Sequence, residues 1–295
     1  MQSVIGFIGL GIMGGAISRN LLEDGVAVIG CDIDAEICRQ LETAGAQVAS
    51  TPKAVAEQAS IIFTSLPSPA ALNAVIDGPT GLTEAKGDGR VVVELSTLRM
   101  EDKQKAREAL AVPGFDLLDA PISGTGKQAI TRDISIYASG SKPGYDVVKP
   151  IFDQFARSTH YVGEFGNGSR MKFVANLLVA IHNVATAEAL TLGMKSGLDP
   201  QAMLDVLGDG AGSSRMFQVR GPVMVDQAYD DAGMKMDVWQ KDLDIIGDFA
   251  ASTRTQTPLF DASVLLYEQA LAAGYTKQDT AVVCRILEQM AELKR

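Results

Sequence analysis

Lys172 and Asn176 lie four residues apart where the apolar run FVANLLVAI begins. Side chains at i and i+4 share one face of a helix, so these two polar groups would stand together. Burying a lysine costs free energy unless its ammonium is paired or neutral. Burial and cationic neighbours, for which Arg170 and Lys241 are candidates, lower a lysine pKa toward roughly 7–8 and suit it to proton transfer. The structural alternative is a lysine that extends along the helix end toward water.

A glycine-rich stretch at 9–14, GLGIMG, fits G-x-G-x-x-G between a strand pattern and a helix pattern. In that context the first glycine permits a tight turn, the second lets the backbone approach a pyrophosphate, and the third lets the helix pack closely on the sheet. The phosphates would lie at the helix N-terminus, where free N–H groups favour anions. The predicted cofactor-binding residues of this loop are Gly9, Leu10, Gly11, Ile12, Met13 and Gly14.

Asp32 ends the second strand pattern, 18 residues after Gly14. The ribose-binding acid of dinucleotide folds comes about 20 residues after the glycines. A carboxylate there accepts hydrogen bonds from ribose hydroxyls and repels a 2′-phosphate, and no arginine follows directly in 33–36. We therefore expect NAD rather than NADP. The alternative is an acid that only caps the next helix, in a fold that binds no cofactor.

The elements that carry these residues change in kind along the chain. Before about residue 168, short apolar strand patterns alternate with helical ones, which predicts a doubly wound, mostly parallel α/β sheet. Afterwards the patterns are long and helical, which predicts an all-α domain entered through a long helix. The expected strands are 3–8, 26–31, 61–65, 91–95, 117–119, 134–138 and 161–162. The expected helices include 16–22, 100–110, 145–155, 171–195, 200–207, 237–251, 258–273 and 279–293.

Composition and charge exclude several classes of protein. The 295 residues are 46% hydrophobic and 21% charged, which is ordinary for a soluble chain and long enough for two domains. A net charge of −10 disfavours nucleic acid as a partner. The opening lacks the features of a signal peptide, and no uninterrupted apolar run reaches the ~20 residues of a membrane span. We expect a cytoplasmic protein without membrane partners.

Cysteine and histidine usage points to a reduced chain without a metal. The three cysteines contain no C-x-x-C pair, which suits buried thiols in a reducing compartment. Only two histidines occur, and His182 lies in an apolar helical pattern where a core histidine is expected. A metal site resting on several histidines is therefore not predicted.

Four motifs occur in order: GLGIMG at 9–14, DAPISGT at 119–125, GNGSRMKFVAN at 166–176 and KDL at 241–243. They match GxGxMG, D-x-P-V-S-G-G, G-x-G-x-x-x-K-x-x-x-N and K-D-L of the β-hydroxyacid dehydrogenases. The chain resembles this family, which includes 3-hydroxyisobutyrate and threonate dehydrogenases and tartronate semialdehyde reductase, over nearly its whole length. Four ordered motifs are far more specific than one.

The resemblance implies roles for individual residues. Lys172 matches the catalytic lysine, which takes the proton of the substrate hydroxyl during oxidation and returns it during reduction. Asn176 matches the asparagine that orients the substrate. Ser123 and Gly124 match positions that hold the substrate carboxylate. Lys241 matches a residue that contacts both cofactor and substrate.

The resemblance also implies the organisation and the reaction. Leu66 and Pro67, in SLPS, and Thr97, in LST, match cofactor-contacting positions. A Rossmann-type NAD-binding domain is expected at 1–165 and an all-helical substrate and dimerisation domain at 166–295. The implied reaction moves a hydride between a small β-hydroxy acid and the nicotinamide of NAD, in a homodimer or homotetramer.

The sequence departs from the family after Ser123. Thr125 replaces the second glycine of S-G-G, and bulkier residues follow it. A threonine hydroxyl, with Lys127 and Arg132 nearby in sequence, favours a substrate more polar than 3-hydroxyisobutyrate, such as a polyhydroxylated C3–C4 acid. The alternative places Lys127 and Arg132 on a solvated face. Which acid is used, and in which direction, stays open.

Two other functions compete with this interpretation. Imine reductases share the architecture but usually lack the lysine, so Lys172 speaks against them. A non-catalytic dinucleotide-binding protein, acting as a sensor or scaffold, belongs to a different class and would not need the lysine. The 6-phosphogluconate dehydrogenases share the two-domain plan but have a much longer helical domain.

Overall fold

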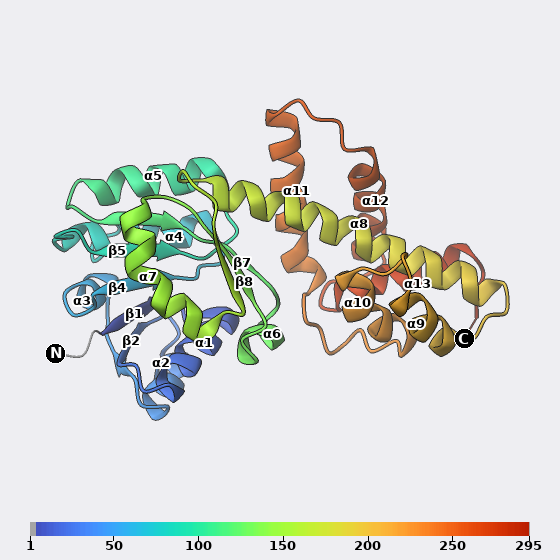
Figure 1. Cartoon of the computed structure of the whole chain (residues 1–295), viewed down its shortest axis with the longest axis horizontal. Helices are drawn as coiled ribbons and strands as arrows, with labels where there is room; N and C mark the ends of the chain where they lie inside the picture. The colour runs from blue at the N-terminus through green and yellow to red at the C-terminus, as the bar shows by residue number, and fades with distance from the viewer. Residues whose placement is uncertain (1–3, 295) are drawn as a thin grey trace. The chain divides into compact units, whose positions relative to one another are not determined.

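The structure is a computed structural model that describes residues 4–294 (Figure 1). Ser3, which the first expected strand included, lies outside the described residues. The chain divides into two compact units, one ending at Lys172 and the other starting at Phe173. The division falls inside α8 (Asn167–Lys195), a helix of 29 residues. The sequence placed the boundary at 165/166, just before this helix.

The first unit contains a sheet of six parallel strands in the order β3-β2-β1-β4-β5-β6. The order runs in opposite directions on the two sides of β1. In open α/β sheets, ligands bind beyond the carboxyl ends of the strands at such a reversal. The parallel pairing and the reversal of strand order at β1 confirm the predicted doubly wound sheet. The strands are β1 (Ile5–Ile8), β2 (Val28–Cys31), β3 (Gln47–Val48), β4 (Ile61–Thr64), β5 (Val91–Glu94) and β6 (Asp116–Asp119).

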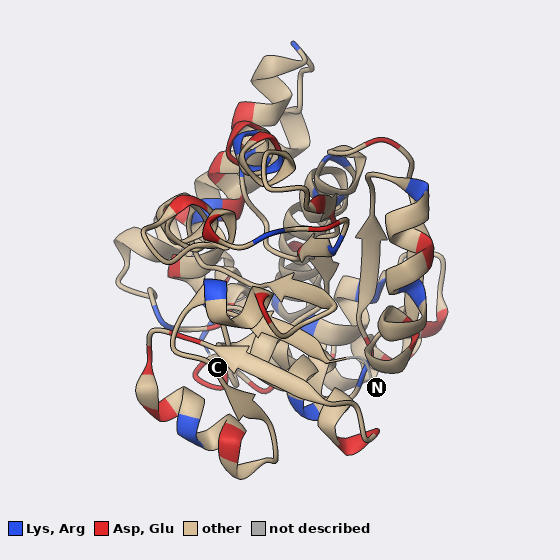
Figure 2. Ribbon diagram, turned by 90° about the vertical axis from the view of Figure 1, so that its left-hand side faces the viewer, with Lys and Arg blue, Asp and Glu red and all other residues tan. Residues whose placement is uncertain are grey.

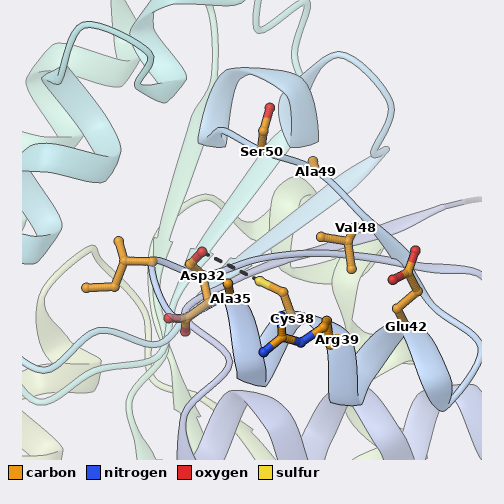
Figure 3. Close-up of a pocket in the computed structure, with 9 residues that line it drawn as sticks. Asp32, Ala35, Cys38, Arg39, Glu42, Val48, Ala49 and Ser50 are labelled. Carbon is orange, nitrogen blue, oxygen red and sulfur yellow. Dashed lines mark hydrogen bonds between the residues drawn. The ribbon is translucent and has the colours of Figure 1, made fainter.

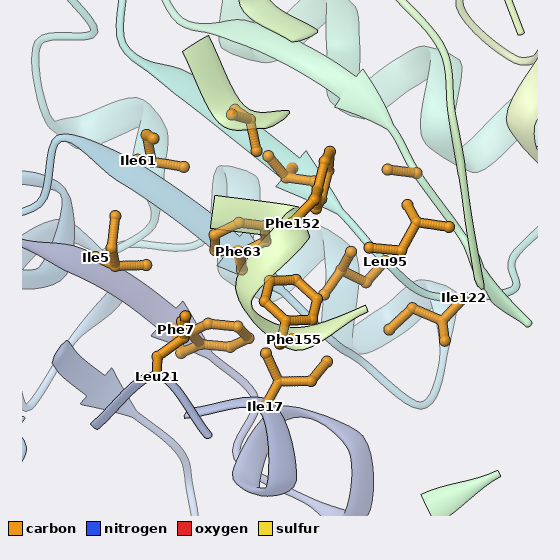
Figure 4. Close-up of a cluster of buried hydrophobic side chains, with 14 of the residues drawn as sticks. Ile5, Phe7, Ile17, Leu21, Ile61, Phe63, Leu95, Ile122, Phe152 and Phe155 are labelled. Atoms are coloured by element: carbon orange, nitrogen blue, oxygen red, sulfur yellow. The ribbon is translucent and has the colours of Figure 1, made fainter. Parts of the chain in front are cut away.

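Helices cover both faces of this sheet, and neighbouring strand residues point to opposite faces. Phe63 packs on the first face, stacked on Phe7 at 4.9 Å between ring centroids and edge-on to Phe152 and Phe155 (Figure 4). Ile62 packs on the second face. The first face is covered by α1 (Ile12–Glu23), α2 (Ala35–Thr43) and α7 (Lys142–Phe155), the second by α3 (Pro52–Ala56), α4 (Pro69–Asp77), η1 (Leu82–Glu84) and α5 (Met100–Ala111).

Two expected strands, at 134–138 and 161–162, do not extend the main sheet. They form a separate sheet in the order β7-β8-β9, made of β7 (Ile122–Ser123), β8 (Ser135–Ala138) and β9 (Ser158–Tyr161). A parallel return needs a crossover of a dozen or more residues. Only the loop and α6 (Gly126–Ile130) separate β7 from β8, so these two strands pair antiparallel.

The second unit is helical, as predicted. Its described residues, 173–294, hold no strand, only an isolated bridge between Lys235 and Asp279. The helix α10 (Arg215–Val225) was not predicted, because Gly221 and Pro222 interrupt its pattern. The remaining helices are α9 (Pro200–Asp209), α11 (Met236–Ser252), α12 (Pro258–Ala272), η2 (Thr280–Val282) and α13 (Val283–Met290).

The long helix α8 has the length and composition of a membrane-crossing helix, with a mean hydropathy of 1.4 over 18 residues, 44% of that stretch being buried. The sequence search for an uninterrupted apolar run did not detect it. One buried polar group on it has two protein partners: the Asn183 Nδ2 donates to the Tyr267 hydroxyl at 3.0 Å and to the Thr280 carbonyl at 2.9 Å. Such contacts are typical of the core helix of a folded domain.

Charged residues are spread over the helices and loops of the chain (Figure 2). Lys and Arg total 26 against 36 Asp and Glu, and the two kinds alternate along many helices. This interspersed pattern is typical of a solvated surface.

Candidate active site

The glycine loop at the end of β1 has the backbone that its sequence predicts. Gly9 has a φ of +87°, and a Cβ on it would lie 2.2 Å from the Ser65 carbonyl oxygen. A Cβ on Gly14 would lie 2.0 Å from the Gly9 carbonyl oxygen. Gly11 caps α1 without a side-chain hydrogen bond and faces open space, with nothing within 4 Å of a Cβ there. The first N–H groups of α1 are therefore approachable by an anion.

The other loop residues divide between core and surface. Leu10 is 3% exposed and packs in the core, and Met13 packs against the same cluster. Ile12, by contrast, is 76% exposed.

Asp32 lies in a pocket of about 350 Å³ at the carboxyl end of β2 (Figure 3). Its Oδ2 accepts a hydrogen bond from the Leu10 N–H at 2.6 Å, and its Oδ1 accepts one from the Asp34 N–H at 2.9 Å. Each carboxylate oxygen can accept further hydrogen bonds. The acid is thus tied to the glycine loop and can still receive ribose hydroxyls.

The charges around this pocket do not favour a phosphate. Glu42 lines it together with Asp32, and Arg39, the arginine in its lining, pairs with Glu36 through two nitrogens. The carboxylate of Glu36 therefore compensates the guanidinium. A 2′-phosphate entering here would meet acidic groups, whereas uncharged ribose hydroxyls would not be repelled.

The cysteines are free and buried, as expected for structural thiols. Burial, with smaller contributions from Cys38 and Asp32, raises the pKa of Cys31 to about 11. Cys31 is therefore a neutral thiol at physiological pH. Among residues 4–294, no three or more His, Cys, Asp and Glu side chains are grouped so that they could hold a metal ion.

Leu66, Pro67 and Thr97 follow β4 and β5, at the same sheet edge as the glycine loop. The Leu66 N–H donates to the Ser96 Oγ at 2.8 Å, which joins the two loops. Pro67 is exposed and Thr97 is half-buried. The fold therefore brings these predicted cofactor contacts to the carboxyl edge beside β1.

The loop after Ser123 has a structural reason for its departure from the family. Gly124 has a φ of +145°, and a Cβ on it would lie 2.7 Å from Ile134 Cγ2. Thr125 caps α6 in a capping box: its Oγ1 accepts from the Gln128 N–H, and the Gln128 Oε1 accepts from the Thr125 N–H at 3.0 Å. The extra hydroxyl thus starts a helix.

Arg132 lies elsewhere than the specificity hypothesis requires. Its guanidinium donates to both carboxylate oxygens of Asp24 at 2.9 Å and to the Asn20 carbonyl at 3.2 Å. These contacts fix the end of α6 on α1, and they raise the pKa of Arg132, chiefly through the Asp24 hydrogen bonds. Arg132 is therefore paired with residues of α1. This agrees better with the alternative, which placed Arg132 on a solvated face.

The start of α8 fits tightly against the end of β6. Gly166 has a φ of +94°, and a Cβ on Gly168 would lie 2.3 Å from the Tyr137 carbonyl oxygen. Asp119 accepts from the Ser169 N–H through Oδ2 and from the Ser169 Oγ through Oδ1, both at 2.8 Å. The two glycines of G-x-G therefore permit the turn and the close approach of the helix.

Lys172 and Asn176 are both buried on α8, at 7% and 4% exposure. The Asn176 Nδ2 donates to Asp242 Oδ2 at 3.0 Å, which fixes the orientation of the amide. Asp242 is buried on α11, and its Oδ1 lies 3.6 Å from Nζ of the neighbouring, partly exposed Lys241. Asp242 is a site residue that sequence reasoning missed, although it is the central residue of K-D-L.

A glycine loop at the sheet's reversal point, an acid tied to it and a buried lysine define a dinucleotide-dependent oxidoreductase. Residues 4–163 match the family described as the NAD binding domain of 6-phosphogluconate dehydrogenase. Residues 166–287 match the family described as the NAD-binding of NADP-dependent 3-hydroxyisobutyrate dehydrogenase. The cofactor is a nicotinamide dinucleotide.

Relatives of known activity match along nearly the whole chain. The 2-(hydroxymethyl)glutarate dehydrogenase of Eubacterium barkeri is 31% identical over 97% of this chain and 95% of its own length. The L-threonate dehydrogenase of Escherichia coli is 32% identical over 96% and 94%. The structure of 3-hydroxyisobutyrate dehydrogenase from Salmonella typhimurium superposes with a TM-score of 0.85 at 30% identity, covering 96% of this chain and 99% of that one. The chain belongs to the β-hydroxyacid dehydrogenase family and is a dehydrogenase.

Proposed function

We propose that the protein oxidises a small β-hydroxy acid with NAD, with Lys172 as the general base, and catalyses the reverse reduction with Lys172 as the acid. The observation that carries this proposal is a buried lysine on the first turns of α8, a helix whose start is fixed by Asp119. A buried, positioned amine is suited to proton transfer near neutral pH.

The roles of the other residues follow from their chemistry. A bound nicotinamide would supply the acceptor for the hydride that leaves the carbinol carbon. Lys172 Nζ takes the hydroxyl proton, so that a carbonyl forms as the C–H and O–H bonds break. Asn176, oriented by Asp242, donates to a substrate oxygen, and Lys241 supplies positive charge to the bound anions. Ser123 and the Gly124 N–H hold the substrate carboxylate.

The competing functions are favoured less. Imine reductases share the fold, as the Pseudomonas sp. enzyme does with a TM-score of 0.63 at 18% identity. A non-catalytic dinucleotide sensor would need no buried lysine. Absorbance at 340 nm with NAD and a panel of hydroxy acids separates these cases, because only a dehydrogenase forms NADH from them.

We expect L-threonate or glycerate to exceed 3-hydroxyisobutyrate in kcat/KM by at least about 10-fold. A site that hydrogen-bonds extra hydroxyls leaves its own polar groups unpaired when the substrate lacks them. The names of the threonate dehydrogenase relatives support a polyhydroxylated substrate. The measurement is kcat/KM for the three acids with NAD.

Thr125→Gly separates the two possible roles of that threonine. Glycine caps a helix almost as well as threonine, so the variant loses only a few tenths of a kcal/mol. If the Thr125 hydroxyl sets specificity, the preference for the polyhydroxylated acids falls in this variant. An unchanged ranking would leave Thr125 as a cap only, and a wild type that prefers 3-hydroxyisobutyrate would refute the polar substrate.

We also propose that the protein is a homodimer or homotetramer of the cytoplasm. Its free cysteines suit a reducing compartment. On α8, Val174, Leu178 and Leu192 are 51%, 47% and 72% exposed, and they recur at a spacing that places them on one side of the helix. An exposed apolar stripe of this kind is typical of an interface between copies.

Leu178→Asp should therefore shift the protein toward the monomer, because it places a charge in the stripe. Light scattering coupled to size-exclusion chromatography measures the mass of wild type and variant. The matched control is Leu265→Asp, an equally exposed leucine on α12 (57%) outside the stripe. A monomeric wild type would contradict the proposal.

A further inference from the structure

Lys103, on α5, is fully buried, and three acceptors surround its ammonium. Its Nζ donates to the Ser96 carbonyl at 2.6 Å and to Asp119 Oδ1 at 2.8 Å, and it lies 2.8 Å from Glu94 Oε2. Two of the three N–H groups of the ammonium therefore have hydrogen-bond acceptors, and Glu94 forms an ion pair with it. Burial alone would lower the pKa of Lys103, but the carboxylates of Asp119 and Glu94 outweigh burial and raise it.

Each acceptor belongs to a segment that carries predicted site residues. Ser96 precedes Thr97, and its Oγ accepts the Leu66 N–H. Asp119 ends β6 and is followed four residues later by Ser123, at the end of β7. The ammonium therefore connects the ends of β5 and β6 directly and the loop after β4 through Ser96.

Asp119 also links the Lys103 cluster to α8, the helix on which the proposed base Lys172 lies. Besides its two bonds to Ser169, its Oδ2 lies 3.3 Å from the Ser139 Oγ, which accepts the Gly168 N–H at 2.9 Å. The first N–H groups of α8 are thus satisfied by Asp119 and Ser139. Lys172 follows Ser169 by three residues on the same helix. The carboxylate that fixes Ser169 therefore also fixes the position of Lys172.

We propose that Lys103 is a positioning residue of the active site. It holds the ends of β5 and β6 against the first turn of α8 and so sets the position of Lys172. The inference rests on the proposed function, since it makes Lys103 responsible for positioning Lys172, the lysine that moves the proton. Lys103 is not that proton carrier itself, because its side chain is wholly buried and its ammonium is held by Ser96, Asp119 and Glu94.

The charge of the cluster explains why a lysine is needed there. One ammonium lies between two buried carboxylates, with side-chain exposures of 0% for Lys103 and Glu94. Removing the cation leaves two like charges buried next to each other, which is strongly unfavourable. The strand ends would separate or take up a proton, and the Asp119 that holds α8 would move with them.

The test compares three variants with wild type by kcat, hydroxy-acid KM, NADH affinity from fluorescence titration, and hydrogen exchange of the 166–173 segment. Lys103→Met should lower kcat by about 10²-fold, the effect of a displacement of about 1 Å. Ser169→Ala, which removes one hydrogen bond to Asp119, should lower kcat by about 10-fold. Ser169→Ala should leave NADH affinity nearly unchanged, whereas Lys103→Met should also weaken it, because Ser96 links Lys103 to the Leu66 loop. Both variants should speed exchange in 166–173.

The double variant Lys103→Met/Glu94→Gln guards against a single variant that does not fold. It removes the second buried charge, and its glutamine can still accept the Ser96 N–H that Glu94 Oε1 accepts at 3.0 Å. We expect it to fold, to bind NADH and to keep the lowered kcat. A double variant with wild-type kcat would overturn the proposal.

The matched control is Arg220→Met in the second unit. Arg220 and Asp279 form another buried ion pair, with side-chain exposures of 6% and 1%. The control should lower the melting temperature of the protein. It should leave kcat per folded enzyme near the wild-type value and hydrogen exchange in 166–173 unchanged. If Arg220→Met lowers kcat as much as Lys103→Met, the effect is general destabilisation and the positioning role is wrong.

Failure of the proposed function would look different. A wild type that oxidises none of the hydroxy acids would refute the reaction but leave the exchange measurement intact. Exchange in 166–173 that is unchanged by Lys103→Met, Ser169→Ala and the double variant would refute the positioning role, whatever the reaction is.

Discussion

Lys172→Ala should lower kcat by about 10²–10⁴-fold, the usual contribution of a positioned proton-transfer group. The affinity for NAD stays nearly unchanged, because the glycine loop and Asp32 belong to the ends of β1 and β2 rather than to α8. Steady-state rates at 340 nm measure the first quantity, and fluorescence titration with NADH measures the second.

The control for this variant is Lys195→Ala, at the other end of the same helix. Lys195 is exposed, and its Nζ donates to the Ala291 carbonyl at 2.7 Å. Its removal changes the net charge equally but should leave kcat near wild type. If Lys172→Ala weakens NADH binding as strongly as it slows turnover, Lys172 supports the fold or the cofactor rather than the proton transfer.

NAD should exceed NADP in kcat/KM by about 10²-fold, which corresponds to about 2.7 kcal/mol. The 2′-phosphate of NADP would approach Asp32, whose carboxylate is held by the N–H groups of Leu10 and Asp34. Arg39 lines the pocket but is paired with Glu36. The ratio of kcat/KM values for the two cofactors at one substrate concentration series measures this preference.

Asp32→Ser/Glu36→Gln should reverse much of the preference. The first change removes the repelling carboxylate, and the second frees Arg39 to meet the phosphate. Glu57→Gln/Glu108→Gln removes two exposed carboxylates outside the pocket lining and controls for the same change in net charge. A wild type that uses NADP as well as NAD would show that Asp32 does not face the ribose.

The main sheet could be predicted because β1, β2, β4 and β5 are apolar runs buried on both faces. The strand β3 could not be predicted, because it is only two residues long and both Gln47 and Val48 are exposed. The strands after Pro121 could be found but not assigned to a sheet. Assigning them depends on the length of the connection between β7 and β8, which the strand pattern alone does not weigh.

The site could be predicted where residues are close in sequence and not where the fold joins distant ones. The spacing of Lys172 and Asn176 was visible, and both lie buried on α8. Lys103 was not recognised, because the highly charged stretch MEDKQKARE at 100–108 predicts a solvated helix. Its contacts with Glu94 and Asp119 depend on the adjacency of β5 and β6, which only the folded sheet provides.

Chemical rescue of Lys172→Ala by small primary amines, followed as NADH formation at 340 nm, tests directly whether Lys172 moves the hydroxyl proton. A free amine that enters the space of the missing side chain can take the hydroxyl proton in its place. We expect methylamine or ethylamine to raise the rate of the variant in proportion to the free-base concentration and to leave wild type unaffected. A Lys172→Ala enzyme that turns over near the wild-type rate without any amine would contradict it.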